Sequence, residues 1–499
     1  MSFPLSMTKK PHFVLVPLLA QGHMIPMIDM ARLLAKQGVV VSLVTTPLNA
    51  SRSASNIKQD QTNGLLINLV VIPFPWQEVG LPSRCENLDS LPSRDLIHKF
   101  YHALDLMQNP LEEYLEKQKL PPSCIISDRY MYWTSETAQK FNIPRIVFHG
   151  TGAFALLCSH NVKLHNAHVS VASNSEVFEI PEMPLRVDVS RMQLPSAVIA
   201  SGNLDDIRAR VEKAESSAYG VVMNTFDDLE RSCIDAYQEK IKKKVWCIGP
   251  VSMCNKETLD KFTRGNNSSI NEKQCIEWLD SMKPKSVLYV CLGSQCRLIP
   301  SQLFELGLAL EASNHPFIWV INRRERFKEL EKWLVDENFE ERNKRKGLLI
   351  IGWAPQVLIL SHPSIKGFLT HCGWNSVIEG ICSGVPMITW PMFSEQFLNE
   401  ILIVKILKIG ISVGVRVQVR WGEEEKVGVV IRKHEIKKSI KRLMDERIDE
   451  EEEEEIRKRA QEVGGLARKA IGEGGSAEVN IKLLIQDIIN FRIPSQQSF

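Results

Sequence analysis

The stretch from Trp353 to Gln396 gathers aromatic, imidazole, amide and hydroxyl side chains around several turn-forming glycines and prolines. Within it, "GFLTHCGWNS" indicates a strand, a turn at Gly373 and a helix that starts near Asn375–Ser376. The first turn of a helix presents free N–H groups and partial positive charge, which favour phosphate. Gly373 places no side chain between a ligand and the backbone, and His371 just before it is a second donor. These residues predict a phosphate site.

Two further residues of this stretch match the rest of a nucleotide. Glu379 lies one turn into the predicted helix, where a carboxylate would weaken phosphate binding unless it faced ribose hydroxyls instead. Trp353 stands at a strand-to-loop junction, where an indole can stack on a base and contribute ~1–3 kcal/mol. Any one of these side chains alone would be interpreted as a core or interface residue. Phosphate, ribose and base contacts together indicate a nucleotide.

A histidine and an aspartate follow two predicted strands in the first half of the chain. His23 lies after the first strand in "LLAQGHMIP", between a glycine and the next helix, and Asp128 ends the strand "CIISD". The carboxyl ends of parallel strands form the edge at which ligands bind. An imidazole with a pKa of ~6.5 can act as a general base when a carboxylate fixes its tautomer. On these residues alone, loop or helix-capping roles stay open for both, since only the fold can bring them together.

The elements that must position these residues alternate between apolar runs and helical patterns. Continuous apolar runs are typical of strands covered on both faces, and strand–helix–strand order predicts a parallel, doubly wound sheet. The runs are HFVLVP, VVVSLVTTP, INLVVIPFP, CIISD, RIVFHG and GVVMNTF, followed later by SVLYVCLGS, PFIWVI, GLLIIGW, IKGFLTH and VPMITWP. The polar stretch Cys254–Gln274 separates the two series and is predicted to be a linker. Two tandem α/β domains form a cleft between their strand ends, where small ligands bind.

Three local features of the helices are also predicted. Pro26 is expected near the start of the helix after the first strand, where proline is tolerated. The acidic run near the C-terminus contains acid-first i,i+4 pairs such as Glu455–Arg459, so it is interpreted as a solvated helix without a function. The last helix is expected to begin at Ser476, which would be its N-cap.

Composition argues against several classes of protein. The 499 residues, of which 44% are apolar, suffice for two domains with full cores. A net charge of +2 gives no electrostatic basis for binding nucleic acid or an acidic membrane. Eleven scattered cysteines indicate buried free thiols in a reducing compartment. No apolar run reaches the ~18–20 residues of a membrane span, and the first run indicates a strand rather than a signal peptide, so we expect a soluble cytoplasmic protein.

The same residues resemble those of a known family. Trp353–Gln396 is similar to the signature (PSPG) box of the family 1 UDP-sugar-dependent glycosyltransferases of plant secondary metabolism, with WAPQ, THCGWNS, Glu379, GVPM, WP and the closing Gln396 in place. The resemblance extends to GHMIP, NTFDDLE, IGP, SVLYVCLGS and EGGS elsewhere in the chain. RWGEEEKVGV and the overall similarity favour the branch that acts on triterpenoids and flavonoids.

This resemblance implies an α/β GT-B fold of two facing Rossmann-like domains with parallel sheets. The expected divisions are an acceptor-binding domain at 1–253, a linker at 254–274, a UDP-sugar-binding domain at 275–475 and a C-terminal helix within 476–499 that packs back on the first domain. The expected partners are a UDP-sugar donor and a small-molecule acceptor. We expect a monomer with no nucleic-acid partner and no integral membrane segment.

The resemblance also implies a role for each site residue. His23 is the expected catalytic base and Asp128 its partner. Trp353 should stack on uracil, Gln356 should lie by the base or ribose, and Glu379 should hold the ribose hydroxyls. Diphosphate contacts are expected from His371, Asn375, Ser376 and Ser294, and sugar contacts from Trp374, Glu395, Gln396 and Thr151, with Ala354 completing the UDP-sugar site. The family commonly closes its box with Asp-Gln, so Glu395 leaves the choice of sugar open, although a closing Gln is associated with glucose and a His with galactose.

The expected chemistry is transfer of a sugar to an alcohol. The acceptor hydroxyl must lose a proton, the anomeric carbon must tolerate positive character, and the leaving diphosphate must be stabilised. The chain has no Asp-x-Asp and no metal-ligand spacing of Cys and His, so no metal or other cofactor is expected. Charge on the leaving group should fall on His371, Ser294 and the helix N-terminus. Direct attack on an α-linked donor gives a β-glycoside with inversion.

Several alternatives were weighed against this function. An NAD-dependent oxidoreductase or a P-loop kinase would share the fold class, but the chain has neither G-x-G-x-x-G after a strand nor GxxxxGK followed by Ser or Thr. A non-catalytic binder of lipophilic small molecules stays open, as does transfer of galactose or glucuronic acid. Glucuronate would favour an added cation facing the sugar. Arg32 and Arg145 are candidates, but their placement in a helix or a strand explains each of them more simply. Triterpenoid aglycones are the first expected acceptors and flavonoids the second, in a pocket formed by Phe148–His160 and Met183–Pro195.

Overall fold

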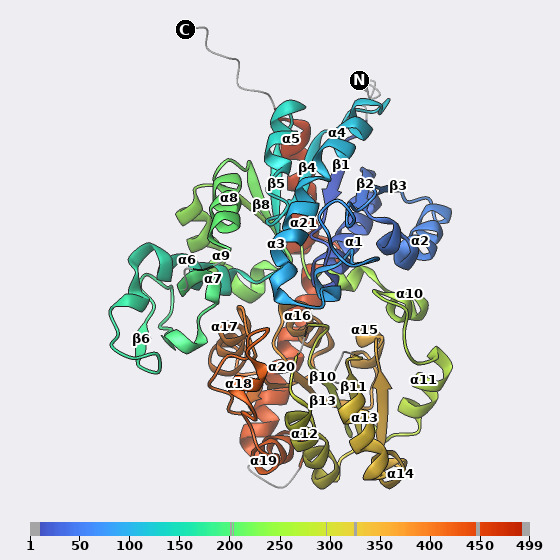
Figure 1. Cartoon of the computed structure of the whole chain (residues 1–499), viewed down its shortest axis with the longest axis vertical. Helices are drawn as coiled ribbons and strands as arrows, with labels where there is room; N and C mark the ends of the chain where they lie inside the picture. The colour runs from blue at the N-terminus through green and yellow to red at the C-terminus, as the bar shows by residue number, and fades with distance from the viewer. Residues whose placement is uncertain are drawn as a thin grey trace.

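Two parallel β-sheets, each flanked by helices, form two Rossmann-like domains, drawn one above the other in Figure 1. The computed structural model describes residues 10–199, 202, 204–295, 297–323, 327–445 and 450–491. Residues 1–9 and 492–499 of the predicted domains lie outside these described residues. The architecture confirms the predicted α/β GT-B fold of two facing domains with parallel sheets.

The first sheet has seven parallel strands in the order β3-β2-β1-β4-β5-β8-β9. They are β1 (His12–Val16), β2 (Val40–Thr45), β3 (Ile67–Val71), β4 (Cys124–Asp128), β5 (Arg145–His149), β8 (Gly220–Met223) and β9 (Lys244–Cys247). The strand order reverses between β1 and β4, which are neighbours in the sheet. Such a reversal opens a crevice at the carboxyl ends of the two strands.

The second sheet repeats this plan with six parallel strands in the order β12-β11-β10-β13-β14-β15. They are β10 (Val287–Cys291), β11 (Phe317–Ile321), β12 (Gly347–Ile351), β13 (Ile365–Thr370), β14 (Met387–Thr389) and β15 (Gly410–Ser412). Its order reverses between β10 and β13, so a second crevice lies at their carboxyl ends. A separate antiparallel pair consists of β6 (Val177–Glu179) and β7 (Asp188–Ser190).

Helices connect the strands and cover both sheets. The first domain contains α1 (Gln21–Lys36), α2 (Pro47–Thr62), α3 (Ile97–Asp105), α4 (Gln108–Glu116), α5 (Thr134–Lys140), α6 (Ala153–His165), α7 (Ser196–Ile199), α8 (Asp205–Ser216) and α9 (Asp227–Ile241). The connection carries α10 (Thr258–Thr263) and α11 (Glu272–Asp280). The rest of the chain contains α12 (Pro300–Ser313), α13 (Phe327–Asp336), α14 (Phe339–Asn343), α15 (Gln356–Leu360), α16 (Trp374–Ser383), α17 (Gln396–Ile401), α18 (Glu424–Val427), α19 (Lys433–Met444), α20 (Glu450–Ala470) and α21 (Ser476–Ile489).

Burial along the strands follows their position in the sheet. Every residue of β1, β4 and β5 is buried, as expected for central parallel strands covered on both faces. The edge strand β3 has an exposed Asn68 and Val71 instead. The continuous apolar runs of the sequence therefore correspond to the central strands, whose carboxyl ends lead into the two crevices.

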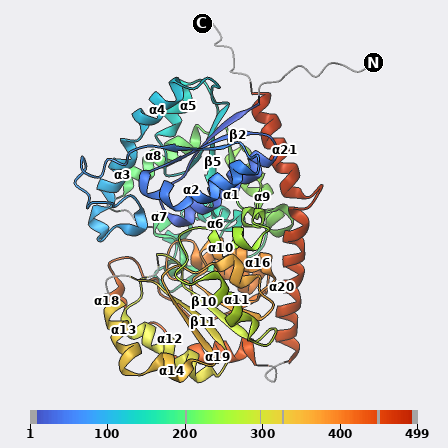
Figure 2. The ribbon, with the colours of Figure 1, turned by 90° about the vertical axis from the view of Figure 1, so that its right-hand side faces the viewer.

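The last two helices return from the second domain to the first. α20 packs against both α16 and α9, and α21 packs against β9. Figure 2 shows the pair running along one side of the molecule past both domains. Ile481, Leu484 and Ile488 of α21 are buried in the same core as Phe13 of β1. The exact domain boundaries stay predictions.

The first turn of α1 differs from the sequence-based expectation. The helix begins at Gln21, so His23 lies in its first turn rather than in a loop before it, and Pro26 lies inside the helix. Proline has no N–H and cannot donate to the carbonyl four residues earlier, which is that of Gly22. This carbonyl instead accepts a hydrogen bond from Asn375 Nδ2 at 2.6 Å. The carbonyl that Pro26 leaves without a helical partner in α1 thus makes a contact with α16.

Other local predictions are corrected in small ways. α16 begins at Trp374 with Gly373 as its N-cap, one residue earlier than expected. The N-cap of α21 is Gly475, so the prediction that Ser476 has this role is wrong. The predicted solvated helix in the acidic run is confirmed by α20, where Arg459 pairs with an exposed Glu455. The short strands β6, β7, β9 and β15 are not among the predicted strands.

Two general expectations concern membranes and thiols. Within the described ranges, no helix is long and apolar enough to cross a membrane. The cysteines in this part of the chain are free, and most of them are buried. These cysteines therefore agree with the prediction of buried free thiols that was based on their scattered positions in the sequence.

Packing of α21 on the first domain predicts unequal effects of two neighbouring leucines. Leu484 is fully buried, so Leu484→Ala should lower the free energy of unfolding by about 2–4 kcal/mol through lost burial and a residual cavity. Leu483 is 52% exposed, so Leu483→Ala is the matched control and should change it by less than about 0.5 kcal/mol. Urea denaturation followed by tryptophan fluorescence measures both. Equal losses would contradict the packing of α21.

Candidate active site

One cavity of 1890 Å³ is lined by loops that follow the strands of both sheets. All of the site residues predicted from the sequence line it: His23, Asp128, Thr151, Ser294, Trp353, Ala354, Gln356, His371, Trp374, Asn375, Ser376, Glu379, Glu395 and Gln396. The predicted acceptor segment Phe148–His160 contributes several lining residues, whereas Met183–Pro195 contributes only Pro195. The fold therefore gathers in one place the groups expected to serve base, donor and acceptor.

His23 and Asp128 lie on either side of the reversal in the first sheet. His23 is in the first turn of α1, which follows β1, and Asp128 is the last residue of β4. The imidazole Nδ1 lies 2.6 Å from Asp128 Oδ2, and the N–H of Tyr130 donates to Asp128 Oδ1 at 3.0 Å. The His23 side chain is 31% exposed, whereas that of Asp128 is 1% exposed. The ring is thus held from the protein side, while Nε2 is left to accept a proton in the cavity.

Each member of this pair stabilises the charged form of the other. Burial is the largest influence on His23 and by itself lowers the pKa of the imidazole, but the charge and hydrogen bond of Asp128, with a contribution from Glu395, outweigh it. The pKa of His23 therefore lies above its ordinary value of 6.5. Burial raises the pKa of Asp128, but His23 and the N–H of Tyr130 bring it below its ordinary value. An ionised Asp128 favours the tautomer with its proton on Nδ1.

His371 lies at the end of β13, on the second sheet, beside the N-terminus of α16. Its ring packs directly against the backbone of Gly293 and Gly373. A Cβ atom added to Gly293 would lie 2.5 Å from His371 Nε2, and one added to Gly373 would lie closer still, so neither position has room for a side chain. Burial lowers the pKa of His371 to about 4, so the imidazole is neutral at pH 7. It can donate a hydrogen bond to a phosphate but adds no charge. Positive potential at this point comes from the α16 N-terminus.

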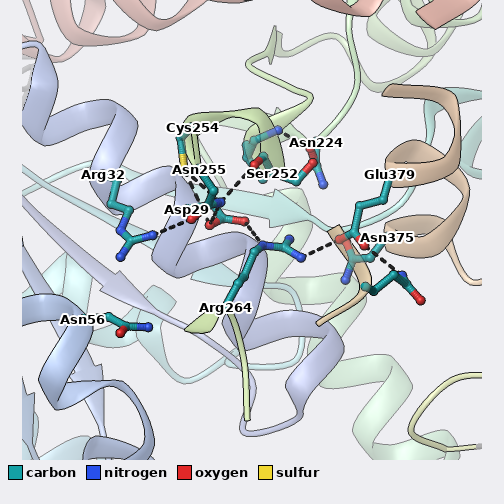
Figure 3. Close-up of polar contacts among 12 residues, drawn as sticks. Asp29, Arg32, Asn56, Asn224, Ser252, Cys254, Asn255, Arg264, Asn375 and Glu379 are labelled. Carbon is teal, nitrogen blue, oxygen red and sulfur yellow. Dashed lines mark hydrogen bonds and ion pairs between the residues drawn. The ribbon is translucent and has the colours of Figure 1, made fainter. Parts of the chain in front are cut away.

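Glu379 is held by side chains from two other elements. Gln356 at the start of α15 donates through Nε2 to Glu379 Oε2 at 2.8 Å and to Ser376 Oγ at 3.1 Å. Arg264 of the connecting segment donates through Nη1 to Glu379 Oε1 at 2.6 Å. Figure 3 shows Arg264 between Glu379 and Asp29, with an ion pair on either side. Sequence reasoning missed Arg264, because no local pattern marks a single arginine in a polar linker.

Trp353 follows β12 and borders the same part of the cavity. Its main-chain N–H donates to Ser269 Oγ at 2.9 Å, which ties it to the connecting segment. Gly265 lies against the indole, since a Cβ there would come within 2.5 Å of Trp353 Cζ2. The buried polar atoms Trp353 Nε1, His371 Nδ1, Asn375 Oδ1 and Thr151 Oγ1 have no hydrogen-bond partner among the residues that the structure describes. Buried polar groups of this kind are expected where a polar ligand binds.

Two residues of the box bind the first domain directly. Trp374 is buried, and its Nε1 donates to the carbonyl of Asn224 at 2.8 Å, so the indole cannot donate to a sugar and only its main chain is left to do so. Asn375 Nδ2 donates to the Gly22 carbonyl, next to His23. The helix expected to bind the diphosphate is thereby fixed against the helix that carries the histidine.

The remaining predicted residues lie around these groups. Gln396 is buried, and its Oε1 accepts the main-chain N–H groups of Met392 at 2.9 Å and Phe393 at 3.1 Å. Its Nε2 is then the group left to donate to a ligand. Glu395 accepts from Ser394 Oγ at 2.5 Å, and the carbonyl of Ser294 accepts from Asn322 Nδ2 at 2.7 Å.

Two family models together match most of the chain. The model of glycosyltransferase N-terminal domains matches residues 11–253, and that of the UDP-glucoronosyl and UDP-glucosyl transferases matches residues 229–452. UDP-glycosyltransferase 73D1 of Arabidopsis thaliana is 54% identical over 495 residues, which are 97% of this chain and 98% of that protein. The chain belongs to the plant UDP-glycosyltransferase family.

Two solved structures show how far the fold of this glycosyltransferase is shared. Glycyrrhiza uralensis UGT73P12, complexed with glycyrrhetinic acid 3-O-monoglucuronide, matches with a TM-score of 0.88 at 34% identity and 96% coverage of both chains. Phytolacca americana UGT2, complexed with UDP-2fluoro-glucose and pterostilbene, matches with a TM-score of 0.73 at 25% identity, covering 96% of this chain and 99% of that one. The glycosyltransferase is therefore an enzyme that uses a UDP-sugar.

Two other expectations concern cations in the glycosyltransferase. Within the part of the chain that is described, no group of three or more His, Cys, Asp or Glu is placed to hold a metal ion. That no cofactor is needed stays a prediction. Arg32 donates to Asp60 and Asn255, and Arg145 donates to Ser127 and Thr134. Neither arginine lines the cavity, so their structural placement accounts for both.

The raised pKa of His23 can be measured directly. NMR titration of histidine-labelled enzyme, with the signal assigned through its loss in His23→Ala, should place this pKa above 6.5. Asp128→Asn removes the charge that favours the imidazolium, so burial should then dominate and the pKa should fall below that of the unmodified enzyme. The same pKa in both proteins would contradict the coupling of the pair.

Proposed function

We propose that this glycosyltransferase transfers glucose from UDP-glucose to a hydroxyl of a lipophilic plant natural product, a triterpenoid or a flavonoid, to give a β-glucoside. The main support is the His23–Asp128 pair, joined at 2.6 Å in the cavity that the signature-box residues also line. Transfer to an alcohol needs a base within reach of the acceptor hydroxyl and a bound donor beside it. Candidate groups for both requirements line the same cavity.

In the proposed reaction, His23 Nε2 accepts the proton of the acceptor hydroxyl as the oxygen attacks the anomeric carbon. The new carbon–oxygen bond forms while the bond from the anomeric carbon to the β-phosphate oxygen breaks. The electron pair of that bond leaves with UDP. Asp128 stays ionised and stabilises the imidazolium that forms. Attack on the face opposite the diphosphate inverts the anomeric centre of an α-linked donor.

The leaving diphosphate is proposed to lie at the N-terminus of α16, without a metal ion. The first-turn N–H groups of this helix and the neutral His371 are hydrogen-bond donors in a partly buried site. Ser294 and Ser376 border the same region of the cavity. Fixed donors that meet developing negative charge are the usual source of leaving-group stabilisation.

The acceptor is proposed to be apolar apart from its reacting hydroxyl. The first-domain side of the cavity has many apolar lining residues: Leu91, Phe148, Ala155, Leu156, Leu164, Pro195, Val198 and Tyr237. Charged residues such as Arg94, Arg129 and Glu215 line this side as well, and the apolar part of the wall is the part suited to a lipophilic small molecule. The likeness to Glycyrrhiza uralensis UGT73P12, solved with a triterpenoid glucuronide, supports a triterpenoid first.

Glucose is proposed as the donated sugar. Gln396 closes the box, and its Nε2 is free of the backbone contacts made by Oε1, so it can donate to a sugar hydroxyl. The likeness to Phytolacca americana UGT2, solved with UDP-2fluoro-glucose, supports the same sugar. Galactose and glucuronic acid are the alternatives; Arg32 and Arg145 do not line the cavity, although other arginines such as Arg129 and Arg323 do.

A non-catalytic binder of lipophilic molecules is the remaining alternative of another class. UDP release from UDP-glucose, UDP-galactose and UDP-glucuronic acid, with triterpenoid and flavonoid acceptors read by mass spectrometry, distinguishes these cases. The proposal expects a β-glucoside with UDP-glucose. Binding of acceptor and UDP without release in any combination would favour the binder.

His23→Ala should reduce transfer by at least about 10²-fold, because the acceptor hydroxyl loses its base. UDP affinity, measured by isothermal titration calorimetry, should stay within about twofold, since the box is untouched. In the unmodified enzyme, kcat/KM should fall as the pH drops through the raised pKa of His23, because the imidazolium cannot accept a proton. Transfer by His23→Ala at the unmodified rate would contradict the assigned base.

Trp353→Ala tests the opposite half of the site. Loss of stacking on uracil should weaken UDP binding by about 5–150-fold, corresponding to ~1–3 kcal/mol. Trp278→Ala is the control, because Trp278 lies on α11 and does not line the cavity. Calorimetry with UDP measures both variants. Equal affinities in Trp353→Ala and Trp278→Ala would exclude a stacking role.

A further inference from the structure

The predicted linker contributes a charged side chain to the nucleotide end of the cavity. Arg264 is nearly buried, with 10% of its side chain exposed, and it joins two carboxylates that belong to different domains. Its Nε donates to Asp29 Oδ2 at 2.8 Å, and its Nη1 donates to Glu379 Oε1 at 2.6 Å. Figure 3 shows the guanidinium between α1 on one side and α16 on the other.

Asp29 holds Arg264 from the side away from the cavity. It lies on α1, the helix that carries His23, and its side chain is 1% exposed. Asn255 Nδ2 donates to Asp29 Oδ1 at 2.9 Å and fixes the carboxylate further. Moving Arg264 away would break the ion pair of a carboxylate that is 1% exposed, which is unfavourable even though the charge of Arg32 also acts on Asp29. Asp29 therefore favours the observed position of the guanidinium.

The guanidinium also offsets the negative charge of Glu379, which would otherwise repel a diphosphate. This carboxylate is on α16, whose N-terminus is the proposed site of the diphosphate, and an uncompensated negative charge there would oppose binding. Arg264 supplies the compensating charge at 2.6 Å. A carboxylate can accept about four hydrogen bonds. Arg264 and Gln356 use one on each oxygen, which leaves room for ribose hydroxyls.

The next residue shapes the base end of the same site. Gly265 has a φ of +90°, which favours glycine, and a Cβ there would lie 2.5 Å from Trp353 Cζ2 and 2.9 Å from Ile25 Cδ1. The backbone thus packs between the indole and α1. Arg264 and Gly265 consequently reach the two box residues expected to bind ribose and base.

We infer that Arg264 is a positioning residue of the nucleotide site, which orients and neutralises Glu379 and ties it to Asp29 on the helix that carries His23. The inference rests on the proposed function for the ribose-binding role of Glu379. It extends the UDP-sugar site beyond the second domain and into the connecting segment. Through this one side chain, Glu379 and the helix α1, which carries His23, keep a fixed relative position.

The first test compares Arg264→Met with the unmodified enzyme by calorimetry with UDP. Losing a charged hydrogen-bond donor beside Glu379 should weaken UDP binding by at least about tenfold. The KM for the UDP-sugar should rise, while the KM for the acceptor should not change. Arg186→Met is the matched control, because Arg186 is 74% exposed and does not line the cavity. Unchanged or tighter UDP binding in Arg264→Met would overturn the inference.

A second variant covers the case in which Arg264→Met does not fold. Arg264→Lys keeps the positive charge but cannot bridge two carboxylates with a planar group, so its UDP affinity should lie between those of Arg264→Met and the unmodified enzyme. If only Lys folds, a UDP affinity equal to that of the unmodified enzyme would overturn the inference. Thermal unfolding reports which variants are folded.

A double-mutant cycle tests whether Asp29 acts through Arg264. Asp29 does not line the cavity, yet Asp29→Asn should weaken UDP binding by releasing the guanidinium. In the Arg264→Met background, Asp29→Asn should have no further effect on UDP affinity. Additive losses would contradict the coupling. Because the readout is UDP binding, a failure of transfer to every acceptor would refute the proposed function without deciding this inference.

Discussion

The hydrogen bond between Asp128 and His23 is the contact on which the rest of the active site depends. A carboxylate that is 1% exposed must be paired, and here its partner is an imidazole whose other nitrogen faces the cavity. The pair exists because β1 and β4 are neighbours in the sheet, so that the first turn of α1 and the end of β4 meet at the same edge. Because of this topology, His23 Nδ1 and Asp128 Oδ2 lie 2.6 Å apart although the two residues are 105 positions apart in the sequence.

The proposed base alone would not suffice for transfer, because the proposed donor site lies on the other domain. The proline inside α1 helps to join the two domains, since it leaves the Gly22 carbonyl available for Asn375 of α16. The indole of Trp374 binds Asn224 in the same interface. Both box residues therefore use side-chain atoms to fix one domain against the other, and their main-chain atoms and remaining polar groups border the cavity.

Charge is distributed in the donor half so that an anion can be accommodated. His371 is neutral at pH 7 because of burial, so its hydrogen bond comes without the cost of a buried cation. The carboxylate of Glu379 pairs with Arg264, which also pairs with Asp29, so one guanidinium is shared by two carboxylates. The positive end of α16 is then a fixed source of potential at the proposed diphosphate end. The electrostatics of the site thus combine a helix terminus with closely paired side chains.

The amino-acid sequence by itself determined the parallel α/β architecture and the central strands, and it predicted the nucleotide chemistry of Trp353–Gln396, because continuous apolar runs and ordered motifs are local properties. It did not reveal the short strands β9 and β15, which have few residues to carry a pattern, or the cap of α21. Only the tertiary structure decided that Pro26 lies within α1 and that Arg264 joins Asp29 to Glu379. These partners lie 235 and 115 residues from Arg264, and such a contact depends on how two domains meet rather than on any neighbouring sequence.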